Sequence, residues 1–337
     1  METLVELTRG GLVESRHRGV IAIVDGDGVI RASLGDVEQV VFMRSSAKPL
    51  QIVPLIETGA ADHYGFTQKE LAVMMASHNG EPMHVDAVRS ILGKIGLDEG
   101  ALQCGVHPPM HEPTARELWR KGEEPSAVHN NCSGKHSGML ALAVHRGYPL
   151  DDYTSLDHPV QVQIRATVAN FVGLRPDRIE VAVDGCGVPV FGCPLWRAAH
   201  AYAGLVDPTG FSHRRSEACR RAVAAMQAHP EMVGGTGQFT TDLMRVGQHR
   251  LVCKTGAAGY FAVGVLPTDD TPALGITVKI EDGDPTGRAR GPVVLHLLHE
   301  MGVLQETDLE QLKDHWPSAI CNHRGDEVGE VRIAFDI

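Results

Sequence analysis

The change of hydrophobic period along this sequence is the feature that most constrains its fold. Runs typical of β-strands occur near both chain ends, and apolar residues at helical spacing fill the middle. Such a chain can bury both patterns if the two ends build one sheet and the helices are inserted between them. We therefore predict an α+β fold with a mainly antiparallel sheet. The predicted strands lie at residues 20–24, 29–34, 179–183, 188–191, 250–254, 260–266, 274–280 and 328–336.

Local signals divide the central region into helices and tight turns. Thr67 and Glu70 have the spacing of a capping box, and Pro82 suits the first turn of the next helix, so Ser77–Gly80 is expected in a short loop. We expect one domain of residues 1–337, with a sheet lobe (about 1–60 and 245–337) and a mainly helical lobe (about 61–244). The predicted helices lie at about 49–59, 67–76, 82–95, 134–146, 158–173, 212–228 and 288–302.

Composition excludes several classes of protein. The 31 Lys and Arg residues against 42 Asp and Glu give a net charge of −11, which repels nucleic acid, and aromatic residues make up only 5%. The N-terminal sequence lacks the pattern of a secretory signal, and no apolar run is long enough for a membrane span. The seven cysteines are widely spread, unlike a disulfide scaffold. These features favour a cytoplasmic protein without a nucleic-acid or membrane partner.

Two motifs indicate nucleophilic catalysis. Ser45 and Lys48 fit S-x-x-K, which places both side chains one helical turn apart, so a neutral lysine can take the serine proton. Lys254-Thr255-Gly256 matches the K-T-G of penicillin-recognising enzymes and ends a predicted strand. Both motifs in this order arise by chance in about one chain in a hundred. A strand lysine beside Lys48 is expected to lower its pKa by like-charge repulsion.

Two further polar clusters have simpler interpretations beside the functional ones. Ser77-His78-Asn79-Gly80 either faces a cleft or forms an ordinary turn. In the cluster Asn130–Gly138, thiols and imidazoles favour zinc, and spacing alone nominates Cys132, His136 and Cys186. No C-x-x-C pair is present, and Asn130 or Asn131 can instead cap the helix that begins near Ser133.

Four spaced fragments together resemble the L-asparaginase II family, the class 3 or rhizobial-type L-asparaginases. The likeness extends over nearly the whole chain, from about residue 4 to Asn322–Gly325. It implies hydrolysis of L-asparagine to L-aspartate and ammonia, on a fold like those of serine β-lactamases, penicillin-binding proteins and serine-dependent glutaminases, and it suggests a homodimer. The fragments are Met43–Gln51, Ala76–Glu81, Asn131–His136 and Asp184–Pro189.

The resemblance also implies roles for individual residues. Ser45 looks like the nucleophile with Lys48 as its base, and Ser77 with Lys254 looks like a second Ser-Lys pair. Zinc in a binding or organising role would be held by Cys132, Lys135 and Cys186, which replaces the His136 of the spacing argument. The positions near the substrate are Arg44, His136 and Asp184, where Asp184 can pair with an ammonium group. Gln238 stands where a basic residue is expected in relatives, which puts in doubt a carboxylate contact there.

These observations lead to one expected mechanism and two alternatives. Ser45 attacks the side-chain amide of asparagine, Lys48 takes its proton, and an acyl-enzyme forms and is hydrolysed. The first alternative is a penicillin-binding, β-lactamase-like or glutaminase-like serine hydrolase. The second is a non-catalytic zinc-binding protein.

Overall fold

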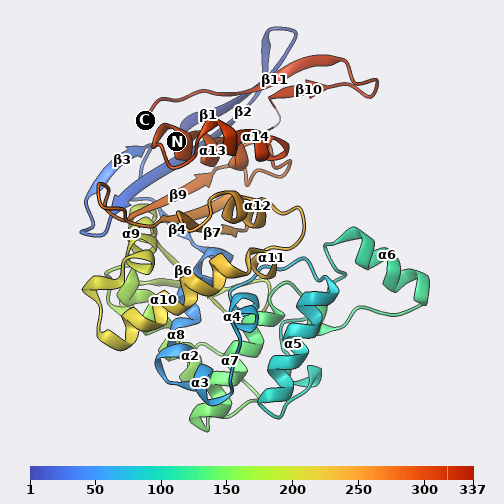
Figure 1. The fold of residues 1–337 in the computed structure, drawn as a ribbon, viewed down its shortest axis with the longest axis vertical. Coiled ribbons are helices and arrows are strands. Elements are labelled where there is room, and N and C mark those ends of the chain that lie inside the picture. Colours follow the sequence, from blue (N-terminus) through green and yellow to red (C-terminus); the bar gives the residue numbers. More distant parts are fainter. Residues whose placement is uncertain (317) are drawn as a thin grey trace.

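The computed structural model describes residues 1–316 and 318–337. Its main sheet has the strand order β10-β11-β1-β2-β9-β8-β7, with β3 paired to β2, and all these pairs are antiparallel. The strands come from the two chain ends, which confirms the predicted α+β fold (Figure 1). Their bounds are β1 Glu2–Arg9, β2 Leu12–Asp25, β3 Ile30–Leu34, β7 Leu251–Gly256, β8 Tyr260–Val265, β9 Leu274–Ile280, β10 Ala319–Cys321 and β11 Glu327–Ile333.

A second, three-stranded sheet connects the main sheet to the helices. It has the order β4-β6-β5, with β4 Val40–Phe42, β5 Glu180–Val183 and β6 Pro189–Pro194. The antiparallel pair β5–β6 confirms the strand–turn–strand unit predicted around Asp184–Gly187. Met43 follows β4 directly, and its N–H donates to the Phe191 carbonyl oxygen at 2.9 Å. This small sheet therefore fixes both the chain entering the S-x-x-K segment and the turn that carries Asp184.

The helices between the sheet strands agree with most of the predicted ranges. The predicted helix at 49–59 is divided in two, because Pro54 lacks an N–H and its ring clashes with an ongoing helix. Among the described residues no helix is long and apolar enough to cross a membrane. The helices are α1 Lys48–Gln51, α2 Val53–Glu57, α3 Ala60–His63, α4 Gln68–Met74, α5 Pro82–Lys94, α6 Glu112–Lys121, α7 Ser133–Arg146, α8 Pro159–Phe171, α9 Leu195–Val206, α10 His213–Ala228, α11 Pro230–Val233, α12 Phe239–Val246, α13 Arg290–Glu300 and α14 Glu306–Gln311.

Helix α9 packs closely on the main sheet, and the sequence prediction missed it. Gly264 and Gly275 lie opposite each other on β8 and β9. A Cβ at Gly275 would come within 1.7 Å of the Ala199 carbonyl oxygen, and one at Gly264 within 3.1 Å of that of Tyr202. The paired glycines thus remove the side chains that would hold the α9 backbone away from the sheet.

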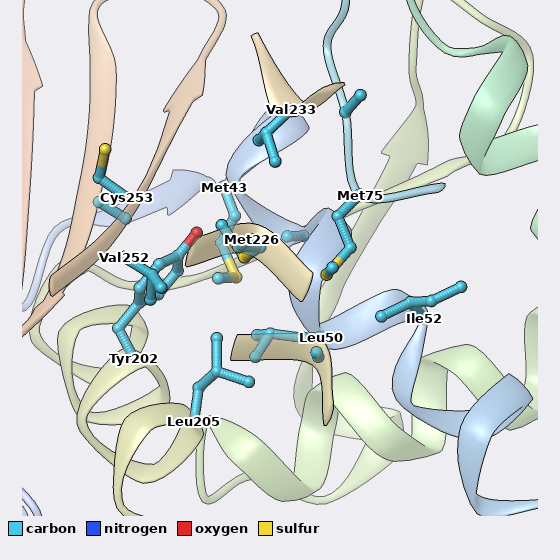
Figure 2. Close-up of a cluster of buried hydrophobic side chains, with 14 of the residues drawn as sticks. Met43, Leu50, Ile52, Met75, Tyr202, Leu205, Met226, Val233, Val252 and Cys253 are labelled. Atoms are coloured by element: carbon cyan, nitrogen blue, oxygen red, sulfur yellow. The ribbon is translucent and has the colours of Figure 1, made fainter. Parts of the chain in front are cut away.

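The core continues beneath the S-x-x-K segment. Figure 2 shows Met43 in the middle of a buried cluster, with Tyr202, Val252 and Cys253 on one side and Met75 and Ile52 on the other. The cluster therefore joins α9 and β7 to the end of α4 through the segment that carries Ser45 and Lys48. The division into a sheet lobe and a helical lobe stays a prediction.

Candidate active site

The hydroxyl of Ser77 lies between two buried lysine amines. Lys254 Nζ donates to Ser77 Oγ at 2.8 Å, and Lys48 Nζ donates to the same oxygen at 3.1 Å. Ser77 is in the loop between α4 and α5, Lys48 begins α1, and Lys254 is on β7. Three segments that are far apart in the sequence therefore converge on one oxygen atom.

Burial of the two lysines favours their neutral form. Lys48 and Lys254 are 1% and 0% exposed. Burial lowers the pKa of Lys254 well below its ordinary value, and the charge of Lys48 lowers it further. Burial also lowers the pKa of Lys48, against the opposing effect of Cys132. The strand lysine was expected to lower the pKa of Lys48, but the like charge that does so is that of Lys135. Between Lys48 and Lys254 the like-charge effect lowers the pKa of Lys254, where it adds to a larger effect of desolvation.

Ser45 lies on the same segment as Lys48 but contacts neither lysine through a hydrogen bond among the described residues. It is in the 3-10 turn Arg44–Ala47, and its side chain is partly exposed. Arg44, directly before it, has φ of 51°, a left-handed backbone conformation that costs free energy for a residue with a Cβ. Buried contacts hold this turn: Ser46 Oγ donates to the Met43 carbonyl oxygen at 2.7 Å, and Tyr202 Oη donates to that of Ser46 at 2.7 Å.

A buried histidine fixes the loop that carries Ser77. The Gly80 N–H donates to His78 Nδ1 at 3.2 Å, so the Nε2–H of His78 faces Ser133 Oγ at 2.9 Å. Burial, together with the nearby cationic side chains, lowers the pKa of His78 well below its ordinary value. His78 is therefore neutral, and it ties the loop to the first turn of α7.

The same loop is also tied to the segment between α11 and α12. Glu81 accepts hydrogen bonds from Thr236 N and Thr236 Oγ1, each at 2.8 Å. Gly235 lies so close to Asn79 that a Cβ would come within 2.3 Å of the amide carbon. Burial raises the pKa of Glu81, but the Thr236 and Asn79 hydrogen bonds outweigh burial and lower it overall. Neither Glu81, the last residue of the fragment Ala76–Glu81, nor Thr236 had a predicted role, because neither belongs to a catalytic motif.

Arg44 and Asp184, both predicted near the substrate, form an ion pair. Arg44 Nη2 and Nε donate to Asp184 Oδ1 at 2.7 and 3.0 Å, and the Gly185 N–H donates to the same oxygen at 2.9 Å. Burial raises the pKa of Asp184, but the Gly185 hydrogen bond and the charges of Lys135 and Arg44 lower it overall. Asp184 is therefore an anion, and its Oδ2 has no hydrogen-bond donor among the described residues.

The three residues of the predicted zinc set lie together in a buried cluster. Lys135 Nζ donates to Cys186 Sγ at 3.0 Å, and Cys132, Lys135 and Cys186 are all buried. The interaction with the Cys186 side chain, with the charges of Lys48 and Lys135, lowers the pKa of Cys132 well below its ordinary value, and the interaction with Cys132 raises the pKa of Cys186. Residues 1–316 and 318–337 contain no cluster of three or more His, Cys, Asp or Glu side chains suited to a metal. The predicted zinc set does not consist of such side chains alone, because one of its three donors is the amine of Lys135.

The donor set fits zinc on chemical grounds. Thiolates and a neutral nitrogen are ligands that zinc accepts, and its tetrahedral ligand atoms lie about 3.5 Å apart. The Lys135 Nζ to Cys186 Sγ distance of 3.0 Å requires only a small expansion. If Cys132, Lys135 and Cys186 held the metal, they would supply three ligands, and a fourth could be water.

His136 has one satisfied and one unsatisfied ring nitrogen. The Gln103 N–H donates to Tyr153 Oη at 2.8 Å, and this hydroxyl is hydrogen-bonded to His136 Nδ1 at 2.7 Å. We assign the hydroxyl as the donor, because its proton has no other acceptor among the described residues. The proton of the neutral imidazole is then on Nε2, which is buried without a hydrogen-bond partner among the described residues. Burial and the neighbouring charges of Lys135 and Lys48 lower the pKa of His136 well below its ordinary value. A buried N–H without an acceptor is suited to a polar group of a ligand.

The comparison with protein families agrees with the four-fragment resemblance. The family model described as L-asparaginase II matches residues 5–333. A search of curated proteins found no match. Among solved structures, the chain is similar to the Bacillus subtilis glutaminase YbgJ in covalent complex with 5-oxo-L-norleucine, with 14% identity, coverage of 85% of this chain and 87% of that one, and a TM-score of 0.40. It is also similar to a β-lactamase from Sphaerobacter thermophilus, with 13% identity, coverage of 86% and 92%, and a TM-score of 0.43.

Proposed function

Because this chain belongs to the L-asparaginase II family, which makes it an amidohydrolase that acts on a small amide, we propose that its substrate is L-asparagine. The products would be L-aspartate and ammonia. The observation that carries the proposal is the position of the Ser77 hydroxyl between the amines of Lys48 and Lys254. A hydroxyl in that position can donate its proton only to an amine that is neutral, which agrees with the lowered pKa of both lysines.

The proposed first step is attack by Ser45. Its Oγ forms a bond to the side-chain carbonyl carbon of asparagine, and its proton passes to neutral Lys48. The negative charge on the carbonyl oxygen is stabilised by backbone N–H groups, including that of Ser45, which has no backbone acceptor among the described residues. The carbon–nitrogen bond then breaks, and the proton held by Lys48 goes to the leaving nitrogen to give ammonia.

The second step releases L-aspartate. Water attacks the ester carbon and gives a proton to a neutral lysine, the bond to Ser45 Oγ breaks, and Ser45 recovers a proton. In this proposal Ser77 passes protons between the two amines, since its oxygen lies within 3.1 Å of each. Lys254 thereby restores the neutral form of Lys48 during turnover.

The groups around this centre are suited to an amino acid. The unoccupied oxygen of Asp184 can accept a hydrogen bond from the substrate ammonium, and the unsatisfied Nε2–H of His136 can donate to a polar substrate atom. We propose that Cys132, Lys135 and Cys186 hold zinc, and that the metal organises this side of the site. A lysine binds zinc only as the neutral amine and a cysteine only as the thiolate, so metal binding must displace the protons of Lys135 and Cys186. The homodimer and the cytoplasmic location stay predictions.

Measuring ammonia release tests the proposal most directly. The purified chain is incubated with L-asparagine or L-glutamine, with zinc or with a chelator, and bound metal is measured by mass spectrometry. We expect turnover of L-asparagine exceeding that of L-glutamine, and one zinc per chain that the chelator removes with weaker substrate binding. Preference for L-glutamine would overturn the substrate assignment. Stoichiometric acylation by a labelled penicillin without ammonia release would favour the penicillin-recognising alternative, and tight zinc with no amide turnover would favour the non-catalytic one.

A further inference from the structure

Arg290 lies beside the catalytic lysine of the K-T-G motif. It is the first residue of α13, and its Nη1 donates to Thr255 Oγ1 at 2.9 Å and to the Gly256 carbonyl oxygen at 3.3 Å. Both acceptors follow Lys254 directly on β7. The charge of Arg290 is also among the causes that lower the pKa of Lys254. The guanidinium therefore borders the same site as the two lysines.

This guanidinium has no carboxylate partner within 4.0 Å among the described residues. Other partly buried arginines do have one: Arg215 pairs with Glu57 at 2.8 Å, and Arg250 pairs with Asp308 at 2.9 Å. The carboxylate nearest in sequence, Asp284, instead accepts the Ala289 and Arg290 backbone N–H groups. Burial lowers the pKa of Arg290 and outweighs the charge of Asp284, which raises it, so the cation is taken out of water without full compensation.

The unpaired edge of the guanidinium has the geometry of a carboxylate receptor. Arginine carries five N–H donors, and the two contacts to β7 occupy only Nη1. Nε and Nη2 donate to no acceptor among the described residues. These two nitrogens form a planar edge that binds the two oxygens of a carboxylate side by side.

We propose that Arg290 binds the α-carboxylate of the amino-acid substrate; this inference rests on the proposed function. Arg44, the other arginine of the site, already donates Nε and Nη2 to Asp184, so it lacks the free planar edge that Arg290 has. With the open oxygen of Asp184 facing the ammonium, each charge of the zwitterion has a partner. With this contact the enzyme distinguishes an amino acid from a simple amide. The contact also holds the side-chain amide of the substrate in position beside the serines.

The test compares substrates with and without the carboxylate. Ammonia release by the wild type and by Arg290→Gln is measured on L-asparagine and on β-alaninamide, which is asparagine without its carboxylate. On L-asparagine we expect KM to rise about 10- to 100-fold with a smaller change in kcat. On β-alaninamide the two enzymes should agree within about threefold, because the lost contact does not exist there. Arg290→Lys should recover part of the lost binding, because it keeps the charge but not the planar edge.

Matched controls separate binding from a merely structural role. Arg288→Gln removes the same charge from an exposed neighbour and should leave KM unchanged. Binding of L-aspartate to each variant, measured by calorimetry, gives a readout that does not depend on turnover, and circular dichroism checks folding. An equal loss on both substrates, or unchanged KM and aspartate affinity in Arg290→Gln, overturns the inference. A wild type that releases no ammonia from L-asparagine overturns the proposed function instead.

Discussion

Ser45 and Ser77 differ in their contacts, and this difference decides how their roles can be tested. Ser77 Oγ contacts both lysines, whereas Ser45 is partly exposed next to a strained Arg44. A hydroxyl that passes protons needs such contacts permanently. A nucleophile needs them only when substrate is bound, since catalytic hydrogen bonds are often long in a free enzyme.

Replacing each serine by alanine should therefore have different consequences. Ser45→Ala should lower kcat by at least about 10³-fold and abolish the covalent adduct, because no oxygen remains to form the ester. Ser77→Ala should slow turnover but still allow an adduct on Ser45. Acid quenching followed by peptide mass spectrometry locates the adduct. An adduct on Ser77 in the Ser45→Ala variant would exchange the two roles.

The residues of the candidate site could be predicted from the sequence when they belong to a motif. Ser45, Lys48 and Lys254 belong to motifs whose spacing has chemical meaning, so they were identified from the sequence. Motif spacing alone did not bring them to Ser77, because that contact depends on which strand and which loop meet in the fold; only the family resemblance paired Ser77 with Lys254. Arg290 gave no signal at all, since it lies in a short basic stretch whose ordinary meaning is a solvated surface.

Among the strands and helices too, the ones that a local sequence signal marks were predicted, and one that depends on packing between distant segments was missed. The hairpin β2–β3 and the turn between β5 and β6 were predicted because glycine and aspartate mark their turns. Helix α9 was missed because it is rich in alanine, and because only Arg197 and His200 mark its half-buried face as polar. Its real signal is the pair Gly264 and Gly275 on two distant strands, which has meaning only when their pairing is known.

Helix α7 packs closely on the end of α4 because its first turn contains a glycine. A Cβ at Gly134, in its first turn, would come within 2.0 Å of the Val73 carbonyl oxygen at the end of α4. Gly134→Ala must therefore push the two helices apart, and we expect it to lower the free energy of unfolding by about 3 kcal/mol or more, or to prevent folding. Displacement of Lys135 should also weaken the zinc binding that we propose.

A second glycine provides the matched control for this prediction. Gly93 is also helical, in α5, but a Cβ added there would meet nothing within 4 Å, and its backbone is right-handed. Gly93→Ala should raise the free energy of unfolding by about 0.5–1 kcal/mol, because alanine loses less backbone entropy. Urea unfolding of both variants measures the two opposite signs. Equal effects would show that the close contact of α7 with α4 does not limit stability.

At the scale of the whole molecule, the site depends on the helices around α4 staying docked, and Glu70 supports this docking. Its carboxylate accepts hydrogen bonds from Lys94 Nζ at 2.6 Å, from Thr67 N at 2.7 Å and from Ser90 Oγ at 2.8 Å. These contacts join the start of α4 to the end of α5, on either side of the loop that carries Ser77. Burial raises the pKa of Glu70, but the hydrogen bonds from Lys94 and Thr67 outweigh it and lower the pKa overall.

The lowered pKa fixes the sign of the pH dependence. Because the carboxylate has a lower pKa folded than unfolded, its stabilisation is fully present above the unfolded value of about 4.3 and is lost as the pH falls through the folded value. Glu70→Gln should therefore lower the free energy of unfolding by about 1–3 kcal/mol at pH 7, and the difference from wild type should shrink below about pH 4. Urea unfolding at several pH values measures it, with Glu124→Gln as the control at an exposed carboxylate. A difference that stays constant or grows in acid would mean that the Glu70 charge does not hold α4 and α5 together.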